Sequence, residues 1–256
     1  MSFDLATLPA WAFAFVLVLG RIGAALTLLP GLGEAAPPAM LRAGLAVGIT
    51  LLLLPSVAPL VPPVPAAMPV AAGMIAAEVL TGLWLGWLAR LLAVALPLAG
   101  QFIAFMLGVS NVLVTDTELG AQGSALQQLF SLVAPLALLI SGLYALPLAA
   151  LAGSYDLIGP GRLLPVGDGT ALATRAVSEC FALALKLASP FVLAAVVWHV
   201  VIGLLARLVP RLPVYFIALP GQILGGMLLL AALATALIAT WQGAVGAGFA
   251  RLPGLP

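Results

Sequence analysis

Residues 100–122 read GQFIAFMLGVSNVLVTDTELGAQ and interrupt an otherwise apolar chain. The first half of this segment is apolar enough to lie inside protein or lipid. The second half, from Gly108 onward, gathers polar and acidic side chains with no basic residue to neutralise them. Irregular backbone at membrane depth is tolerated only where protein buries it or where it lines a cavity. The segment therefore predicts a constriction that faces an internal path, or, equally well on composition, an ordinary connection between two helices.

A gate or plug is our interpretation of residues 108–122. Glycine lacks a Cβ, so Gly108, Gly120 and Gly123 can serve as hinges. An apolar centre at 112–114 could narrow a path by dewetting, while the acidic residues stay hydrated at one mouth. In the competing interpretation, the apolar centre only packs in a helix interface. The predicted gate residues are Gly108, Ser110, Asn111, Val112, Leu113, Val114, Asp116 and Glu118.

Composition places the chain among membrane proteins. Of its 256 residues, 64% are hydrophobic and 7% are charged, whereas a soluble domain is about 45–50% apolar and about 25% charged. The net charge of +1 provides no basic surface for nucleic acid. Cys180 is the single cysteine, so no intrachain disulfide is possible. No Lys or Arg precedes the first apolar run, and we therefore expect that run to remain in the mature protein.

The apolar runs predict six or seven helices of the length that a bilayer requires, about 20 residues each. We expect one integral domain over 1–256: N-terminal helices in 1–152, a polar loop over 153–175, a helical hairpin over 176–242 and a tail over 243–256. Prolines inside the apolar runs predict kinked helices. The candidate helices are 10–29, 40–61, 68–96, 98–114, 124–152, 176–209 and 214–242, and the prolines are Pro97, Pro135, Pro147, Pro190 and Pro220.

Small residues four apart predict faces where helix backbones approach closely. Such pairs occur at 44 and 48, 82 and 86, and 221 and 225. Glu78, Gly82, Gly86 and Arg90 form one slanting stripe, because each step of four residues drifts by about 40° on a helix. The stripe allows a proton or ion relay, as in a transporter, or pairing of ions between helices. Ion pairing is favoured, because a relay needs several acids at one depth.

No catalytic or cofactor motif is complete. His199 is the single histidine, which excludes a metal site of two or three histidines. The fragment Gly108-Val109-Ser110-Asn111 lacks the final glycine of a serine nucleophile motif. An intramembrane protease is therefore a distant hypothesis, and His199 is interpreted as a helix-packing residue. We predict no enzyme activity and no cofactor.

Four motifs follow one another along nearly the whole chain. They are Arg21-Ile22-Gly23 to Pro30 with Pro38, Arg42 and Leu51–Pro55; Glu78-x-x-x-Gly82-x-x-x-Gly86; Ala99–Ile103 with Gly108, Ser110 and Asp116; and Ala188-x-Pro190 with Gly203, Arg207, Pro210, Val214, Phe216 and Pro220. In this order they resemble the FliR/SctT family of type III export-gate proteins, which serve flagella and virulence secretion. Two positions depart from the family pattern: Thr117 stands where a proline is common, and Leu143 where a histidine is common.

The resemblance implies an all-α bundle of kinked helical hairpins, one protomer of a hetero-oligomeric gate. It implies a non-enzymatic subunit in the bacterial inner membrane, within the flagellar basal body, that contacts FliP, FliQ, FlhB and membrane lipid. Unfolded flagellar proteins would pass through the assembly. The alternative is a small secondary transporter that uses Glu78. Predicted helix-packing residues are Arg21, Gly23, Arg42, Glu78, Gly82, Gly86, Pro190, Gly203, Arg207, Pro210 and Pro220.

The turn over 208–213 is predicted to face the cytoplasm, because Arg207 and Arg211 bracket it and short loops with Lys or Arg prefer that side. The test is to replace Cys180 with serine, introduce Leu212→Cys and label intact cells with a thiol reagent that cannot cross the inner membrane. Labelling is expected only after the membrane is permeabilised. Labelling from the periplasm alone would reverse the orientation.

Overall fold

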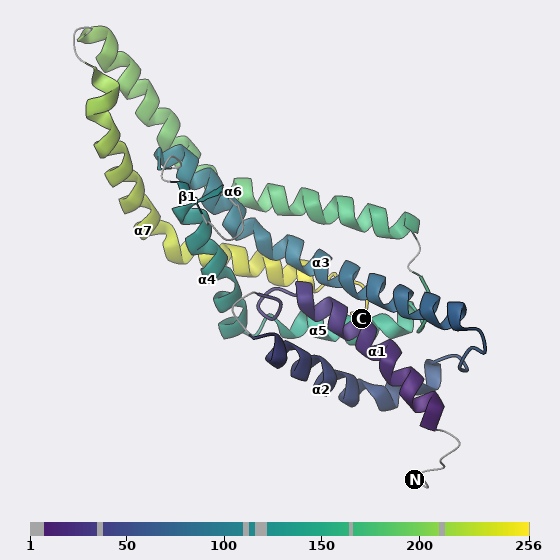
Figure 1. Ribbon diagram of the computed structural model, residues 1–256. Coiled ribbons are helices and arrows are strands. Elements are labelled where there is room, and N and C mark those ends of the chain that lie inside the picture. The colour runs from purple at the N-terminus through teal and green to yellow at the C-terminus, as the bar shows by residue number, and fades with distance from the viewer. Residues whose placement is uncertain are drawn as a thin grey trace. The chain divides into compact units, whose positions relative to one another are not determined.

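The computed structural model describes residues 8–34, 38–109, 113–115, 122–163, 166–209 and 213–255. The described chain is helical apart from two strands of three residues each, so the all-α fold class is confirmed (Figure 1). In chain order the elements are α1 (Leu8–Leu28), α2 (Ala39–Val57), the 3-10 helix η2 (Ala58–Leu60), α3 (Met68–Leu107), β1 (Leu113–Thr115), β2 (Gln122–Ser124), α4 (Ala125–Ser141), α5 (Ala145–Leu157), α6 (Val166–Leu208) and α7 (Val214–Phe249).

Within the described residues, five helices are long and apolar enough to cross a membrane, or six if α4 and α5 together form one broken span. The predicted helices 68–96 and 98–114 are one helix, α3, and Pro97 lies inside it. Proline removes one backbone hydrogen bond from a helix interior, and here the helix continues through that loss. The predicted helix 124–152 is instead divided at Gly142, whose φ of 75° is a left-handed value that suits glycine.

The predicted polar loop over 153–175 is too long. Helix α5 extends to Leu157 and α6 begins at Val166, so most of that segment is helical. The residues that break the helix are concentrated at 159–161, where Gly-Pro-Gly occurs and Gly161 has a φ of 76°. Ser154 and Tyr155, which precede this turn, belong to α5 and are buried rather than solvated.

The chain divides into two compact units, and both are discontinuous in sequence. The first unit contains Met1–Leu92, Leu138–Val177 and Gly246–Pro256, and the second contains Ala93–Ala137 and Ser178–Val245. Neither unit matches the predicted division into N-terminal helices, loop, hairpin and tail. A single integral domain over 1–256 stays a prediction.

The core of the first unit is built where α1 crosses α3. Leu17, Val18 and Ile22 on α1 are fully buried. On α3, a Cβ added to Gly82 would overlap the backbone carbonyl of Arg21, and one added to Gly86 would lie 2.6 Å from the carbonyl oxygen of Ala25. Only glycine permits this approach of the two backbones. In contrast, within the described part of the chain no atom lies within 4 Å of a Cβ added to Gly44 or Gly48 on α2.

The second unit has its core between α3, α6 and α7. Ile103 on α3, Phe191 on α6 and Trp241 on α7 are all fully buried. Apart from this core, α6 and α7 carry many exposed apolar side chains, such as Leu193 at 68% and Phe216 at 74% exposure. These exposed faces matter for the function proposed below.

Replacing Gly82 with leucine should prevent the chain from folding, because overpacking already costs about 1–3 kcal/mol when only side chains must move. Here the clash is with backbone, which cannot rotate away. Resistance of the membrane-inserted chain to limited proteolysis should be lost. Gly44→Leu, on a helix with open space at that position among the described residues, is the matched control and should keep it. A Gly82→Leu chain that resists proteolysis as well as the unmodified chain would contradict the prediction.

Candidate functional site

An ion pair without solvent contact joins α1 to α3. Arg21 Nε donates to Glu78 Oε2 at 2.8 Å, and Arg21 Nη2 donates to Glu78 Oε1 at 3.0 Å. Both side chains are 0% exposed. Such a two-point contact matches the planar guanidinium to the carboxylate and is the strongest geometry for this pair.

The remaining hydrogen-bonding groups of this pair are satisfied by α5 and the turn that follows it. Arg21 Nη1 donates to Ser154 Oγ at 3.1 Å, and Nη2 also donates to the carbonyl oxygen of Ile158 at 3.0 Å. The backbone N–H of Gly161 donates to Glu78 Oε1. Tyr155 places its ring 4.1 Å from the guanidinium carbon, a cation–π contact. We call these residues the Arg21 network; it fixes α1, α3, α5 and the turn after α5 to one another.

The slanting stripe on α3 is the face that α3 presents to α1. Glu78 meets Arg21, and Gly82 and Gly86 meet the α1 backbone. At the end of the stripe, Arg90 lies 3.6 Å from Glu34, just beyond α1, and this second pair is partly exposed. Both oxygens of Glu78 are buried and accept hydrogen bonds from Arg21 or Gly161, so a transported ion would have to displace these structural contacts.

In the second unit, α3 ends where the predicted gate segment begins. Gly108 has a φ of 74°, its N–H donates to the carbonyl of Phe105 at 3.2 Å, and the N–H of Val109 donates to the carbonyl of Ala104 at 3.1 Å. These two bonds and the left-handed glycine form a Schellman motif, a standard helix C-terminus. A side chain from α7 adds to it, since Gln222 Nε2 donates to the carbonyl of Met106 at 2.9 Å.

The far end of the gate segment returns to the same helix. Strands β1 and β2 pair antiparallel, with Leu113 opposite Ser124. The N–H of Ser124 donates to Gln101 Oε1 on α3 at 3.2 Å. Ser124 Oγ in turn accepts from the N–H of Gln127 at 3.2 Å, which caps the start of α4. Both ends of the segment are therefore anchored to the last two turns of α3.

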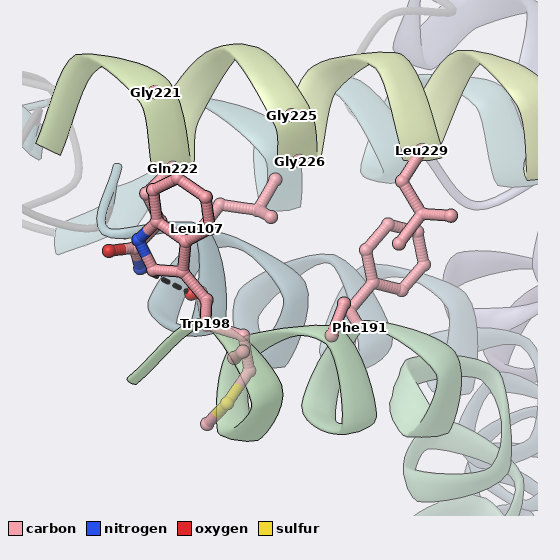
Figure 2. A pocket seen from close by; sticks show the side chains of 11 residues that line it. Leu107, Phe191, Trp198, Gly221, Gln222, Gly225, Gly226 and Leu229 are labelled. Carbon is pink, nitrogen blue, oxygen red and sulfur yellow. Dashed lines mark hydrogen bonds between the residues drawn. The ribbon is translucent and has the colours of Figure 1, made fainter. Parts of the chain in front are cut away.

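A cavity of about 300 Å³ lies beside this end of α3, between α3, α6 and α7 (Figure 2). Its walls are mostly apolar, with Trp198 and Gln222 as the polar exceptions. The lining residues are Met106, Leu107, Phe191, Ala194, Ala195, Trp198, Gly221, Gln222, Gly225, Gly226 and Leu229.

Several predicted site residues are not brought together. Among the described residues, Gly23 and Gly203 have no atom within 4 Å of an added Cβ, and the buried Nε of Arg42 on α2 has no hydrogen-bond partner. Arg207, near the end of α6, and Pro220, on α7, are exposed, while Pro190 inside α6 is half-buried. For the predicted gate residues Gly108, Leu113 and Val114, the structure gives the backbone: Gly108 ends α3, and Leu113 and Val114 pair with β2. Ser110, Asn111, Val112, Asp116, Glu118 and Pro210 lie outside the described residues.

Sequence reasoning did not find Ser154, Gly161, Trp198 or Gln222. The partners of Arg21 on α5 are more than 130 residues away, and no local pattern marks them. One missed feature did have a signal. Ser124-x-x-Gln127 has the spacing of a capping box, which predicts a helix beginning directly after Ser124.

Long apolar helices joined by a buried ion pair define a polytopic helical membrane protein. The chain belongs to the family described as "Bacterial export proteins, family 1", which matches residues 12–247. It is similar to the flagellar biosynthetic protein FliR of Caulobacter vibrioides, with 31% identity over 91% of this chain and 94% of the relative. The FliR proteins of Bacillus subtilis (29% identity; 82% of each chain) and Escherichia coli (26%; 88% and 85%) are also similar. The family predicted from the four motifs is thereby confirmed.

Removing one partner of the Arg21–Glu78 pair should destabilise the protein by about 3–5 kcal/mol, because the other charge is then buried alone. The expected result is a large loss for Glu78→Gln in SDS-induced unfolding from mixed micelles. The double variant Arg21→Met with Glu78→Met should recover most of that loss, since no charge is left unpaired. Arg90→Leu breaks the partly exposed pair and is the control, with an expected change of about 0–1 kcal/mol. Equal stability of Glu78→Gln and the unmodified protein would contradict the assigned pairing.

Proposed function

We propose that the chain is a structural and gating subunit of the flagellar type III protein export gate. In this proposal it lies in the bacterial inner membrane, within the flagellar basal body, and assembles with FliP, FliQ and FlhB. Unfolded flagellar proteins pass through the assembly, and the segment 108–122 helps to close it. Family membership and the names of the relatives, all flagellar biosynthetic proteins, support the flagellar assignment.

Helix length supports a subunit that partner chains cover. Exposed apolar side chains on α6 extend from Phe181 to Leu208, a distance of about 40 Å at 1.5 Å per residue. The hydrocarbon core of a bilayer is about 30 Å thick. If the helix stood perpendicular to the membrane plane, the bilayer core would therefore leave part of this face in water. Adjacent protein chains, in contrast, can cover all of it.

The observation that carries the gating proposal is the double anchoring of residues 108–124 on α3. A Schellman motif with Gly108 defines one end, and the capped start of α4 with its bond to Gln101 defines the other. Because both ends are held on α3, our proposal is that the residues between them close the path without movement of the helices. This is the behaviour that a plug requires.

The two rival functions gain no support. A transporter would need Glu78 to exchange an ion or a proton, and Arg21 and Gly161 occupy both of its oxygens. A protease would need His199 to act as a base toward a serine. Its Nδ1 lies 2.6 Å from the carbonyl oxygen of Ala195 on its own helix, and the residue is exposed, so a helix-packing role for His199 stays a prediction. The proposed role is accordingly structural and not enzymatic.

Deleting Ser110–Glu118 should leave an assembled complex that leaks ions, because the helices and their caps remain while the plug is lost. The experiment is co-expression of the variant with the partner chains, purification of the complex, and measurement of growth and ion flux across the inner membrane. Slowed growth and an ion leak are expected together with a normal yield of complex.

A pair of substitution variants separates the gate from the rest of the segment. Val112→Ser, Leu113→Ser and Val114→Ser combined should leak, because a dewetted constriction requires apolar side chains. Asp116→Asn with Glu118→Gln keeps the apolar centre and should remain tight. Loss of the deletion complex without a leak would support packing in a helix interface, and an intact complex without a leak would remove the segment from the gate.

A further inference from the structure

A groove of about 450 Å³ lies in the first unit, between the first half of α3 and the start of α6. Leu80, Trp84 and Trp87 line it from α3, and Leu163 and Ala173 line it from the other side. Its walls are apolar and open, since Leu80 is 57% exposed and Leu163 is 68% exposed. Because α3 is long and apolar enough to cross a membrane, the groove meets lipid unless another chain covers it.

One end of this groove carries a cation that has no counter-ion among the described residues. The N–H of Gly161 donates to Glu78 Oε1, which fixes the turn after α5 beside α3. Arg162 follows in this turn and directly precedes Leu163. It is exposed, and its guanidinium forms no ion pair or hydrogen bond with the described residues. Because the charge of Glu78 is already balanced by Arg21, Arg162 is available to an anion at this end of the groove.

Trp84 adds an accessible hydrogen-bond donor to the wall. Its indole N–H has no partner in the described part of the chain, and it is not enclosed by protein, in contrast to the indole nitrogens of Trp198 and Trp241. Trp84 lies six residues after Glu78, about 9 Å along the axis of α3, and Trp87 lies three residues further on. A cation, a neutral donor and an apolar wall thus follow one another along the groove.

We propose that this groove binds one anionic phospholipid of the surrounding membrane. A phospholipid carries the complementary groups in the same order: a phosphate, an ester carbonyl and an alkyl chain. The phosphate accepts hydrogen bonds from the guanidinium of Arg162, a strong charge-assisted contact, and the ester carbonyl accepts one from the indole N–H of Trp84. The alkyl chain lies against Trp87. Tryptophan suits this level of a membrane because its ring is apolar and its N–H is polar.

The size of the groove favours a lipid over a helix of a partner chain. From Leu80 to Trp87 the wall formed by α3 extends for about 10.5 Å. A helix about 10 Å in diameter would fill roughly 800 Å³ over that length, which is more than the groove contains. The groove volume of about 450 Å³ lies instead within the range of about 300–1,000 Å³ for pockets that hold small ligands. An alkyl chain is narrower than a helix and can bend to follow the wall.

The probe is phosphatidylglycerol that carries a diazirine on its acyl chain. The full chain is irradiated with this probe in mixed micelles of a neutral detergent, and the labelled positions are found by mass spectrometry. Label is expected within 80–87 and 169–173. Unlabelled phosphatidylglycerol should displace the probe about fivefold better than phosphatidylcholine, which corresponds to about 1 kcal/mol for one cation near a membrane surface. The measurement needs no partner chain, so its outcome does not depend on the proposed gate.

Substitutions test the two polar contacts separately. Arg162→Gln should reduce the advantage of phosphatidylglycerol over phosphatidylcholine to about onefold. Arg207→Gln is the matched control, because Arg207 is also exposed but lies outside the groove, and it should leave the advantage unchanged. In the unmodified chain, ester-linked phosphatidylglycerol should compete about fivefold better than its ether-linked analogue, which lacks the carbonyl acceptor. Trp84→Phe removes the indole donor and should abolish this second difference alone.

Filling the groove tests the position of the lipid. Ala173→Trp should abolish labelling, whereas Ala171→Trp, on the exposed surface of the same helix but outside the groove, should not. Limited proteolysis verifies that each variant has folded.

Three outcomes would overturn the proposal. Equal competition by the two lipids in the unmodified chain would describe an apolar groove without a head-group site. Label spread evenly over the exposed apolar helix faces would describe general partition of the probe. Loss of the label when the chain is assembled with its partner chains would show that protein, and not lipid, fills the groove.

Discussion

The pairing of Arg21 with Glu78 is the constraint on which the first unit depends. A single charge at the centre of a membrane helix costs about 2.5–3.5 kcal/mol on insertion scales, and the two charges are tolerable only together. Their contact requires α1 and α3 to approach closely. Gly82, one turn after Glu78, permits that approach by leaving room for the backbone of Arg21. Gly82 and the Arg21–Glu78 ion pair therefore depend on each other. The glycine allows α1 and α3 to approach, and the ion pair requires that approach.

The second unit uses polar groups differently. Here single amides reach helix ends: Gln222 binds the end of α3, Gln101 binds the residue before α4, and Gln242 donates to the carbonyl of Ala137 at 3.2 Å. A neutral amide costs less to bury than a charge and still fixes one backbone group. A buried ion pair thus holds the helices of the first unit, whereas neutral amides bind single backbone groups of α3 and α4 in the second.

Sequence reasoning succeeded where the signal is local or ordered along the chain. Apolar runs predicted the helices, and the order of four motifs predicted the family. It failed where tertiary packing overrides the local sequence signal. Pro97 was expected to separate two helices, yet α3 continues through it. The polar residues near 153–157 were expected in a loop, yet they belong to α5. For the Arg21 network, the stripe on α3 indicated which residues face another helix. Ser154 and Gly161 could not be deduced, because only tertiary packing brings them to Arg21 and Glu78.

The long sequence separation within the Arg21 network has a consequence for biogenesis. Arg21 leaves the ribosome 57 residues before Glu78 and 133 residues before Ser154. At about 5–20 residues per second, the wait for Glu78 alone is roughly 3–11 s. During this interval α1 carries an uncompensated guanidinium and cannot yet rest in the bilayer centre at low cost. The helix must stay at the interface or within the insertion machinery until α3 is made. Because of this order of synthesis, α1 reaches its final position in the membrane only after α3 has been made, although α1 is synthesised before α3.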